Sequence, residues 1–229
     1  MTSRFEGFAP GVTGFLAELA ANNDRAWFAE NKPRYEAEVL APALAFISAM
    51  AQPLAEFAPE FVAVAKRSGG SLMRVYRDVR FSKDKRPYKT NLGIQFRHRL
   101  GKDVHAPGYY FHLEPGRAFI AAGCWRPAGP ALHGIREFLS DNPRGWARAR
   151  DDALAGGFEL AGDSLVRPPR GFAADHPAID DLKRKDFMLL RELDPADLSG
   201  PDAVDRAAGD CRTATPFVAY LCAALDVPF

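Results

Sequence analysis

Apolar and polar residues alternate along four stretches in the middle of the chain, 72–81, 91–100, 109–114 and 118–125. Side chains of a β-strand point alternately to its two faces, so this period of two predicts four strands. A turn at Pro115-Gly116 separates the last two stretches, which predicts a hairpin. Four consecutive strands with short or moderate connections are typical of an antiparallel meander.

Apolar residues recur near the helical period on both sides of these strands. The longest such series, 33–54, predicts a helix, and Pro42 and Pro53 are expected to kink or break it. Residues 130–141 and 201–225 predict further helices after the strands.

The C-terminal third adds shorter elements. Residues 187–193 favour a strand, and 158–160 with 164–167 look like a small hairpin. No repeat, low-complexity run or long linker divides the chain. The sequence therefore predicts an α+β fold in a single domain, 1–229, whose antiparallel sheet, a meander of about four strands, is packed by N- and C-terminal helices.

The alternation over 72–81 separates a core face from a polar face. The predicted core face consists of Met73, Val75, Val79 and Phe81, interrupted by Arg77. The predicted polar face carries Leu72, Arg74, Tyr76, Asp78 and Arg80. Residues 82–91 contain Asp, Pro and Asn and predict a loop, which brings three lysines and Tyr88 close to the end of the strand.

Positive charge is concentrated between Arg74 and Lys89. This segment holds seven basic residues against two aspartates, a net charge of +5, whereas the whole chain carries +1. Arginine offers a planar fork of donors that suits phosphate or carboxylate, and lysine adds a point charge. The pattern predicts a site for an anionic small molecule, with a phosphorylated ligand as the leading candidate. The predicted ligand-binding residues are Arg74, Tyr76, Arg77, Asp78, Arg80, Lys83, Lys85, Tyr88 and Lys89.

Three other interpretations fit the same basic segment. Lys and Arg on an exposed strand edge can serve only to block the addition of another strand. In a nucleic-acid-binding module, Tyr76 and Tyr88 would stack on bases while the basic residues hold phosphates. In a structural or protein-binding domain, the arginines would pair internally and the surface would be flat.

His112 is the candidate catalytic residue, because it shares a strand face with Tyr110 and Glu114 and its unperturbed pKa lies near neutrality. It joins the anion site if that face is the one that carries Arg74. Among so many cations, Asp78 should stay ionised and orient arginines, which shifts the role of general base to His112. The sequence alone does not decide whether a reaction follows binding.

The stretch 76–89, Tyr-Arg-Asp-Val-Arg-Phe-Ser-Lys-Asp-Lys-Arg-Pro-Tyr-Lys, resembles the signature of a family of uncharacterised bacterial and fungal proteins, catalogued as a domain of unknown function. Further stretches that are similar to this family are 23–28, Asn31-Lys32, Tyr35, 123–127 and 165–169. The resemblance spans nearly the whole chain. It implies one compact domain of mixed helix and strand, and it implies no established activity.

Other kinds of site find no support in the sequence. The three cysteines are widely spaced, and the five histidines lack metal-ligand spacing, so neither a disulfide framework nor a metal site is predicted. No glycine motif for dinucleotides or phosphates is present, and no cofactor is predicted. The N-terminus lacks the pattern of a signal peptide, and no apolar run approaches the roughly 20 residues that cross a bilayer, so we expect a cytoplasmic protein without a membrane partner.

Overall fold

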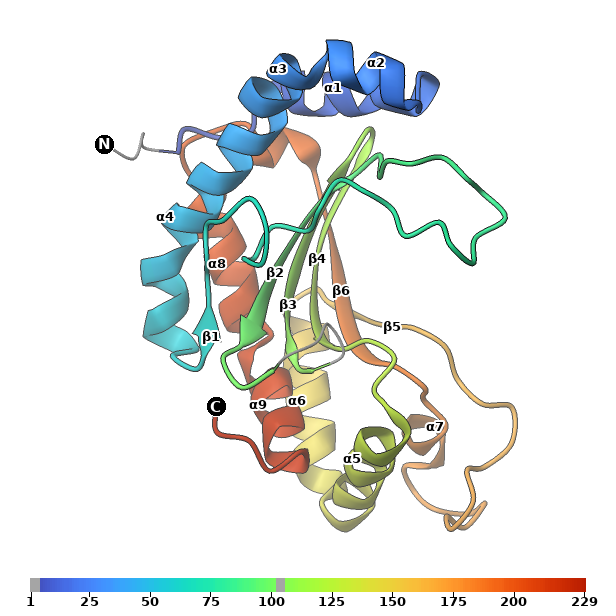
Figure 1. The fold of residues 1–229 in the computed structure, drawn as a ribbon. Helices are drawn as coiled ribbons and strands as arrows, with labels where there is room; N and C mark the ends of the chain where they lie inside the picture. Colours follow the sequence, from blue (N-terminus) through green and yellow to red (C-terminus); the bar gives the residue numbers. More distant parts are fainter. Residues whose placement is uncertain (1–4, 102–105) are drawn as a thin grey trace.

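A six-stranded sheet forms the centre of the computed structural model, which describes residues 5–101 and 106–229 (Figure 1). The strand order is β1-β2-β3-β4-β6-β5, and every neighbouring pair is antiparallel. The strands are β1 Phe61–Val62, β2 Leu92–His98, β3 Gly108–Glu114, β4 Arg117–Cys124, β5 Glu159–Ala161 and β6 Phe187–Leu193. The α+β class is confirmed, with six strands where about four were predicted.

Helices cover one face of this sheet. Figure 1 shows α4 (Ala41–Phe57), α8 (Ala203–Thr213) and α9 (Thr215–Ala224) on the same side of the strands. The remaining helical elements are α1 Pro10–Ala21, α2 Arg25–Glu30, α3 Lys32–Arg34, the π-helical turn η1 Tyr35–Leu40, α5 Gly129–Asp141, α6 Pro143–Ala155, α7 Ile179–Leu182 and the 3-10 turn η2 Pro195–Leu198.

The strand alternation decides which side chains meet the helices. Phe111 of β3 packs on Phe46 of α4, with ring centroids 4.9 Å apart. Ile94 and Ile120 stand opposite Phe111 on the neighbouring strands and are buried with it. Residues at the intervening positions, His112 among them, therefore point to the other face of the sheet, which these helices leave open.

Residues 72–81 do not form a strand, which corrects one of the four that were predicted. Leu72 makes a single bridge to Ile94 at the edge of β2, and Tyr76 makes a bridge to Tyr88 within its own loop. The meander instead begins at β1. Figure 1 shows the following residues leaving the sheet as a long teal loop, and we call 75–89 the projecting segment.

Two aspartates explain why this segment turns away from the sheet. The carboxylates of Asp78 and Asp84 accept hydrogen bonds from the backbone N–H groups two residues later, at 3.2 and 3.0 Å. Such local side-chain bonds compete with a sheet ladder and bend the chain. The exposure of 74–80 still alternates as predicted, but Phe81 is 95% exposed, so its predicted place in the core is wrong.

The helix predicted over 33–54 does not break at its prolines. Helical turns run without interruption from α3 through η1 to the end of α4, with Pro42 directly after the π-helical turn and Pro53 inside α4. An interior proline costs about 3 kcal/mol, whereas burying one large apolar side chain contributes about 1.5–3 kcal/mol. The packing of α4 outweighs this cost, because it buries four such side chains, Phe46, Ile47, Met50 and Leu54.

The helical stretch Lys32–Phe57 meets the length and hydropathy requirements of a membrane span. A core helix of a globular fold meets the same requirements, so the observation is weak. In this fold its apolar face packs into the core described above.

The predictions for the C-terminal third are confirmed in large part. The strand at 187–193 and the helices over 130–141 and 201–225 are present, the last of them divided at Thr213–Thr215. The predicted small hairpin is wrong, because β5 pairs with β6 rather than with 164–167. Ser164 makes only an isolated bridge to Arg184.

Candidate functional site

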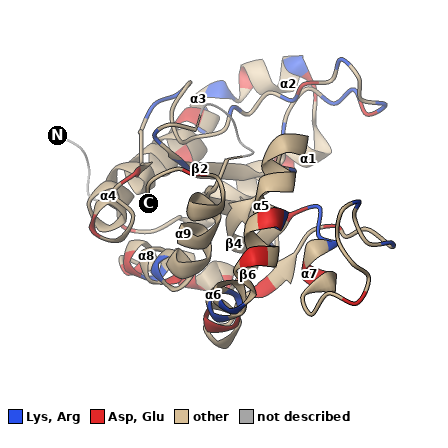
Figure 2. Cartoon of the chain, turned by 90° about the horizontal axis from the view of Figure 1, so that it is seen from below, with Lys and Arg blue, Asp and Glu red and all other residues tan. Residues whose placement is uncertain are grey.

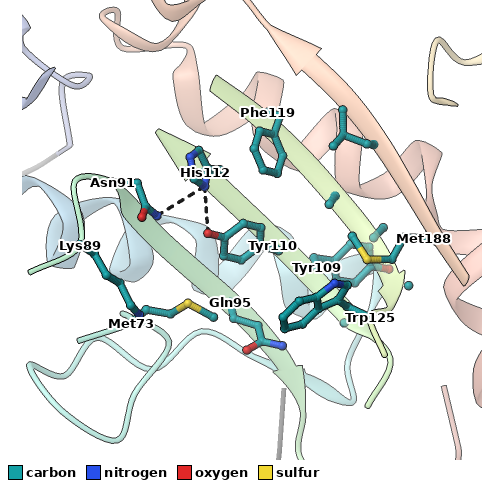
Figure 3. A pocket seen from close by; sticks show the side chains of 15 residues that line it. Met73, Lys89, Asn91, Gln95, Tyr109, Tyr110, His112, Phe119, Trp125 and Met188 are labelled. Carbon is teal, nitrogen blue, oxygen red and sulfur yellow. Dashed lines mark hydrogen bonds between the residues drawn. The ribbon is translucent and has the colours of Figure 1, made fainter. Parts of the chain in front are cut away.

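The open face of the sheet carries a pocket of about 410 Å3 (Figure 3). Its apolar surface comes mainly from Met73, Phe119, Trp125, Met188 and Leu190. Its polar side chains are Lys89, Asn91, Gln95, Tyr110 and His112. A largely apolar hollow with a few converging polar groups is typical of a site for a small organic molecule.

Small residues of β4 leave room for this hollow. Ala121 and Gly123 line it with little or no side chain, and Gly93 lies under Tyr110 and Met73. A Cβ atom on Gly93 would lie only 2.7 Å from the hydroxyl oxygen of Tyr110. Glycine at this position therefore allows the phenol of Tyr110 to lie across β2.

His112 belongs to a hydrogen-bonded group on the pocket wall (Figure 3). Its Nδ1 lies 3.0 Å from the hydroxyl of Tyr110 and 3.4 Å from the amide nitrogen of Asn91, and its ring stacks on Phe119 with centroids 4.5 Å apart. Because both neighbours of Nδ1 can donate, Nδ1 acts as the acceptor and the neutral ring carries its proton on Nε2.

The far side of the imidazole faces Glu114. The Nε2 to Oε2 distance is 3.5 Å, which is an electrostatic approach rather than a hydrogen bond, and Nε2 has no hydrogen-bond partner among the described residues. Burial lowers the pKa of His112, and the charge of Glu114 only partly opposes this effect. His112 is therefore unprotonated at neutral pH.

Lys89 is the member of the predicted ligand-binding set that lines the pocket. Its side chain is half-buried beside Met73, as Figure 3 shows, and makes no hydrogen bond or ion pair within the described parts of the chain. Burial lowers the pKa of Lys89, and the positive charge of Arg74 lowers it further. Arg74 is exposed and likewise has no such partner among residues 5–101 and 106–229.

The other arginines of the segment are already paired. Arg80 binds Asp78 at 2.6 Å, and both Arg77 and Arg86 bind Asp84 at 2.8 Å. The guanidinium of Arg80 lowers the pKa of Asp78 to about 2, so this carboxylate is ionised and tied to an arginine. Figure 2 shows basic and acidic residues interspersed along this segment.

The rest of the predicted set does not reach the pocket. Lys83 and Lys85 are exposed on the projecting segment, and Lys85 donates to the carbonyl oxygen of Val79 at 3.0 Å. Tyr76 is 57% exposed and lies against Tyr88, with ring centroids 5.4 Å apart. Of the predicted set, only Lys89 lines the pocket of His112, and Arg74 is its charged neighbour outside the lining.

Tyr88 anchors the projecting segment to the N-terminal helices. Its ring is buried and stacks on Phe28 of α2 with centroids 4.1 Å apart. Its backbone N–H donates to the side-chain oxygen of Asn23, and its carbonyl accepts from the same amide, both at 3.0 Å. Two of the motifs noted in the sequence, 23–28 and 76–89, therefore meet at the base of the segment.

The sequence did not single out several residues of the pocket. Gln95, Phe119, Trp125 and Met188 come from three strands and a loop, and they meet only because β4 pairs with β6 across a long connection. The usable signal was the alternation in 118–125, which places the small residues Ala121 and Gly123 on one face.

A family model supports the expectation that this chain belongs to an uncharacterised family of unknown function. The model of the conserved hypothetical protein family DUF2461 matches residues 12–220. The chain belongs to this family. Comparison of this DUF2461 member with curated proteins and with solved structures gives no match. Membership supplies no activity, so function has to be argued from the pocket.

Metal and thiol chemistry receive no support from the described part of this DUF2461 chain. No three His, Cys, Asp or Glu side chains gather there to hold a metal ion, and His105 lies outside the described residues. All three cysteines are buried, and burial raises the pKa of Cys222 to about 12. A thiol in such surroundings stays protonated and unreactive.

Proposed function

We propose that this protein binds a small anionic ligand, phosphorylated compounds foremost, with its charged group at Arg74 and Lys89 and its apolar part in the pocket. The observation that supports this proposal is a pair of neighbouring cations with no hydrogen bond or ion pair among the described residues, beside an apolar hollow. Two like charges held together are unfavourable, and an anion between them reverses the sign of that interaction.

Titration with phenyl phosphate, followed by calorimetry, tests this proposal. Replacing Arg74 or Lys89 with alanine is expected to weaken binding about 10-fold or more, since a hydrogen bond to a charged group contributes about 1.5–3 kcal/mol. Lys83→Ala is the matched control, because Lys83 is exposed on the same segment and does not line the pocket. Equal small losses at all three positions would show a diffuse cationic surface instead.

In an enzyme version of this proposal, His112 is the general base. Its lowered pKa leaves it unprotonated at neutral pH, and because Nδ1 accepts from the Tyr110 hydroxyl, a proton from the ligand would reach it through that hydroxyl. Asp78 is excluded from that role, because it is paired with Arg80 outside the pocket.

A second candidate function, binding of single-stranded nucleic acid, is favoured by the exposed tip of the projecting segment. Phe81 presents aromatic surface there and Lys83 adds a cation, while Tyr76 is exposed nearer the base of the segment. Base stacking on an aromatic side chain contributes about 1–3 kcal/mol. The originally predicted partner Tyr88 is buried under Phe28 and cannot stack on a base. Oligonucleotide affinity that falls on Phe81→Ala and not on Lys89→Ala would select this function over the pocket.

A further inference from the structure

Three lysines occur within seven residues of the projecting segment, and the structure gives them different surroundings. Lys83 and Lys85 are exposed to solvent. Lys89 is half-buried, lines the pocket and has Arg74 as its charged neighbour. A lysine that only covers apolar surface with its stem keeps its ammonium group in water. Lys89 departs from that arrangement, because its surroundings penalise the charged form.

These surroundings are the ones that turn a lysine into a nucleophile. A lysine amine is activated when it is desolvated in an apolar pocket or held beside another cation, because both effects favour the unprotonated form. Lys89 experiences both effects, from the apolar lining of the pocket and from Arg74. The carboxylates of the segment do not counteract them, since Asp78 and Asp84 are bound to other arginines.

We propose that the ε-amine of Lys89 forms an imine with the aldehyde or ketone group of a small acidic ligand in this pocket. The inference rests on the proposed function in one respect, namely that Arg74 holds the acid group. The ligand class that follows is a carbonyl compound with a carboxylate or phosphate and an apolar body that fits about 410 Å3.

The reaction needs no oxidant, reductant or metal. The lone pair of the unprotonated amine attacks the carbonyl carbon, a C–N bond forms, and the carbonyl π pair moves to oxygen, which takes up a proton as nitrogen loses one. The resulting carbinolamine expels its hydroxyl as water when the C=N bond forms. Amine and carbonyl thus become imine and water.

The remaining polar residues of the pocket suit this chemistry. Asn91 and Tyr110 line the same hollow. The second amide N–H of Asn91 can donate to the oxygen of the carbinolamine, and the Tyr110 oxygen, whose hydrogen points to His112, can accept from the carbinolamine hydroxyl. Phe119, Trp125 and Met188 supply apolar surface for the body of the ligand.

Reductive trapping with 4-formylbenzoate tests the proposal. The protein is incubated with this aldehyde and sodium cyanoborohydride at neutral pH, and the reduced adducts are located by peptide mass spectrometry. We expect Lys89 to be modified at least ~10-fold faster than Lys83 or Lys85, which are the internal controls. Equal rates at the three lysines would overturn the proposal.

Two variants and one competitor separate this proposal from the proposed function. Lys89→Arg keeps the positive charge but cannot form an imine, so it should lose the fast adduct while Lys83 and Lys85 are modified at their wild-type rates. Arg74→Gln should slow trapping at Lys89 to the rate of Lys83. Benzoate has the acid and the ring without the carbonyl, so calorimetry with benzoate tests anion binding alone. Benzoate binding without selective trapping refutes the imine and leaves the proposed function standing, whereas failure of both measurements refutes both.

Discussion

Side chains of the same type differ in charge state and hydrogen bonding in this protein because they are buried to different extents. Lys85 and Lys89 belong to the same basic run, yet one donates to a backbone carbonyl in solvent and the other lines a pocket. The sequence predicted a cluster of nine ligand-binding residues because charge is visible in a sequence and burial is not. Within that cluster, Arg77 and Arg80 already form ion pairs with Asp84 and Asp78.

Gly93→Ala is expected to shift the side chain of Tyr110, which lies over Gly93 and lines the pocket. The new methyl group would lie 2.7 Å from the Tyr110 hydroxyl and displace it from His112. Affinity for phenyl phosphate should fall, with a modest decrease in Tm. Gly209→Ala in α8 is the control, because nothing lies within 4 Å of its Cβ position. Alanine is the better helix former by about 0.5–1 kcal/mol, so this control should hold or raise the Tm.

Stability should fall as the pH drops below the ordinary pKa of histidine, 6.5, because of His112. Its pKa is lowered in the folded protein, so the unfolded chain binds a proton first and unfolding is favoured below pH 6.5. Urea denaturation across this range is the measurement. His112→Gln should flatten the dependence, whereas His133→Gln, at an exposed position on α5, should leave it unchanged. A His112→Gln profile as steep as that of the wild type would contradict the assignment.

The projecting segment behaves as an element of its own, although it contains no strand or helix. Its two ends are joined by hydrogen bonds from Lys89 N–H to the Val75 carbonyl at 2.7 Å and from Arg77 N–H to the Pro87 carbonyl at 2.9 Å. The Asp–Arg pairs order the tip, and Tyr88 fixes the base to α2. The sequence suggested a strand here because the alternation is real, but alternation does not show whether a neighbouring strand exists.

Asn23→Ala is expected to loosen this base. The amide of Asn23 makes two hydrogen bonds to the backbone of Tyr88, and each part-buried bond contributes about 0.5–1.5 kcal/mol. The free energy of unfolding should therefore fall by about 1–3 kcal/mol, and limited proteolysis should cut the segment faster. Asn22→Ala is the neighbouring control, since its amide bonds only to Glu18 in its own helix. Equal losses for the two variants would show that the base is held by something else.

At the scale of the whole molecule, hydrophobic periodicity predicted the sheet and its helices. The strands β2, β3, β4 and β6 all lie within the predicted stretches to within a residue or two. The predictions that were wrong concern elements whose pairing depends on residues far away in the sequence. The pairing of β5 with β6 depends on the fold between them, and the pocket draws on residues separated by more than 100 positions. The helical stretch Lys32–Phe57 continues past both prolines, because packing of α4 outweighs their local cost.

Phe46 in the core and Phe81 on the surface should differ strongly in their contribution to stability. Phe46 is fully buried and its ring contacts Phe5, Phe8 and Phe111, so Phe46→Ala should lower the free energy of unfolding by about 3–5 kcal/mol. Phe81→Ala, at a 95% exposed position, should change it by less than about 0.5 kcal/mol. Urea denaturation measures both values. A large decrease in the free energy of unfolding for Phe81→Ala would show that this side chain is packed against other residues in solution.

The hydrogen-bonded base of the projecting segment makes the rest of this segment independent of the sheet. Backbone hydrogen bonds join the two sides of the base, from Lys89 to Val75 and from Arg77 to Pro87. The residues between them therefore make no hydrogen bonds to the described strands of the sheet. The length and charge of the segment between Asp78 and Arg86 can therefore be changed without altering the pocket or the core. An engineer can therefore graft an unrelated recognition loop onto the base of this segment.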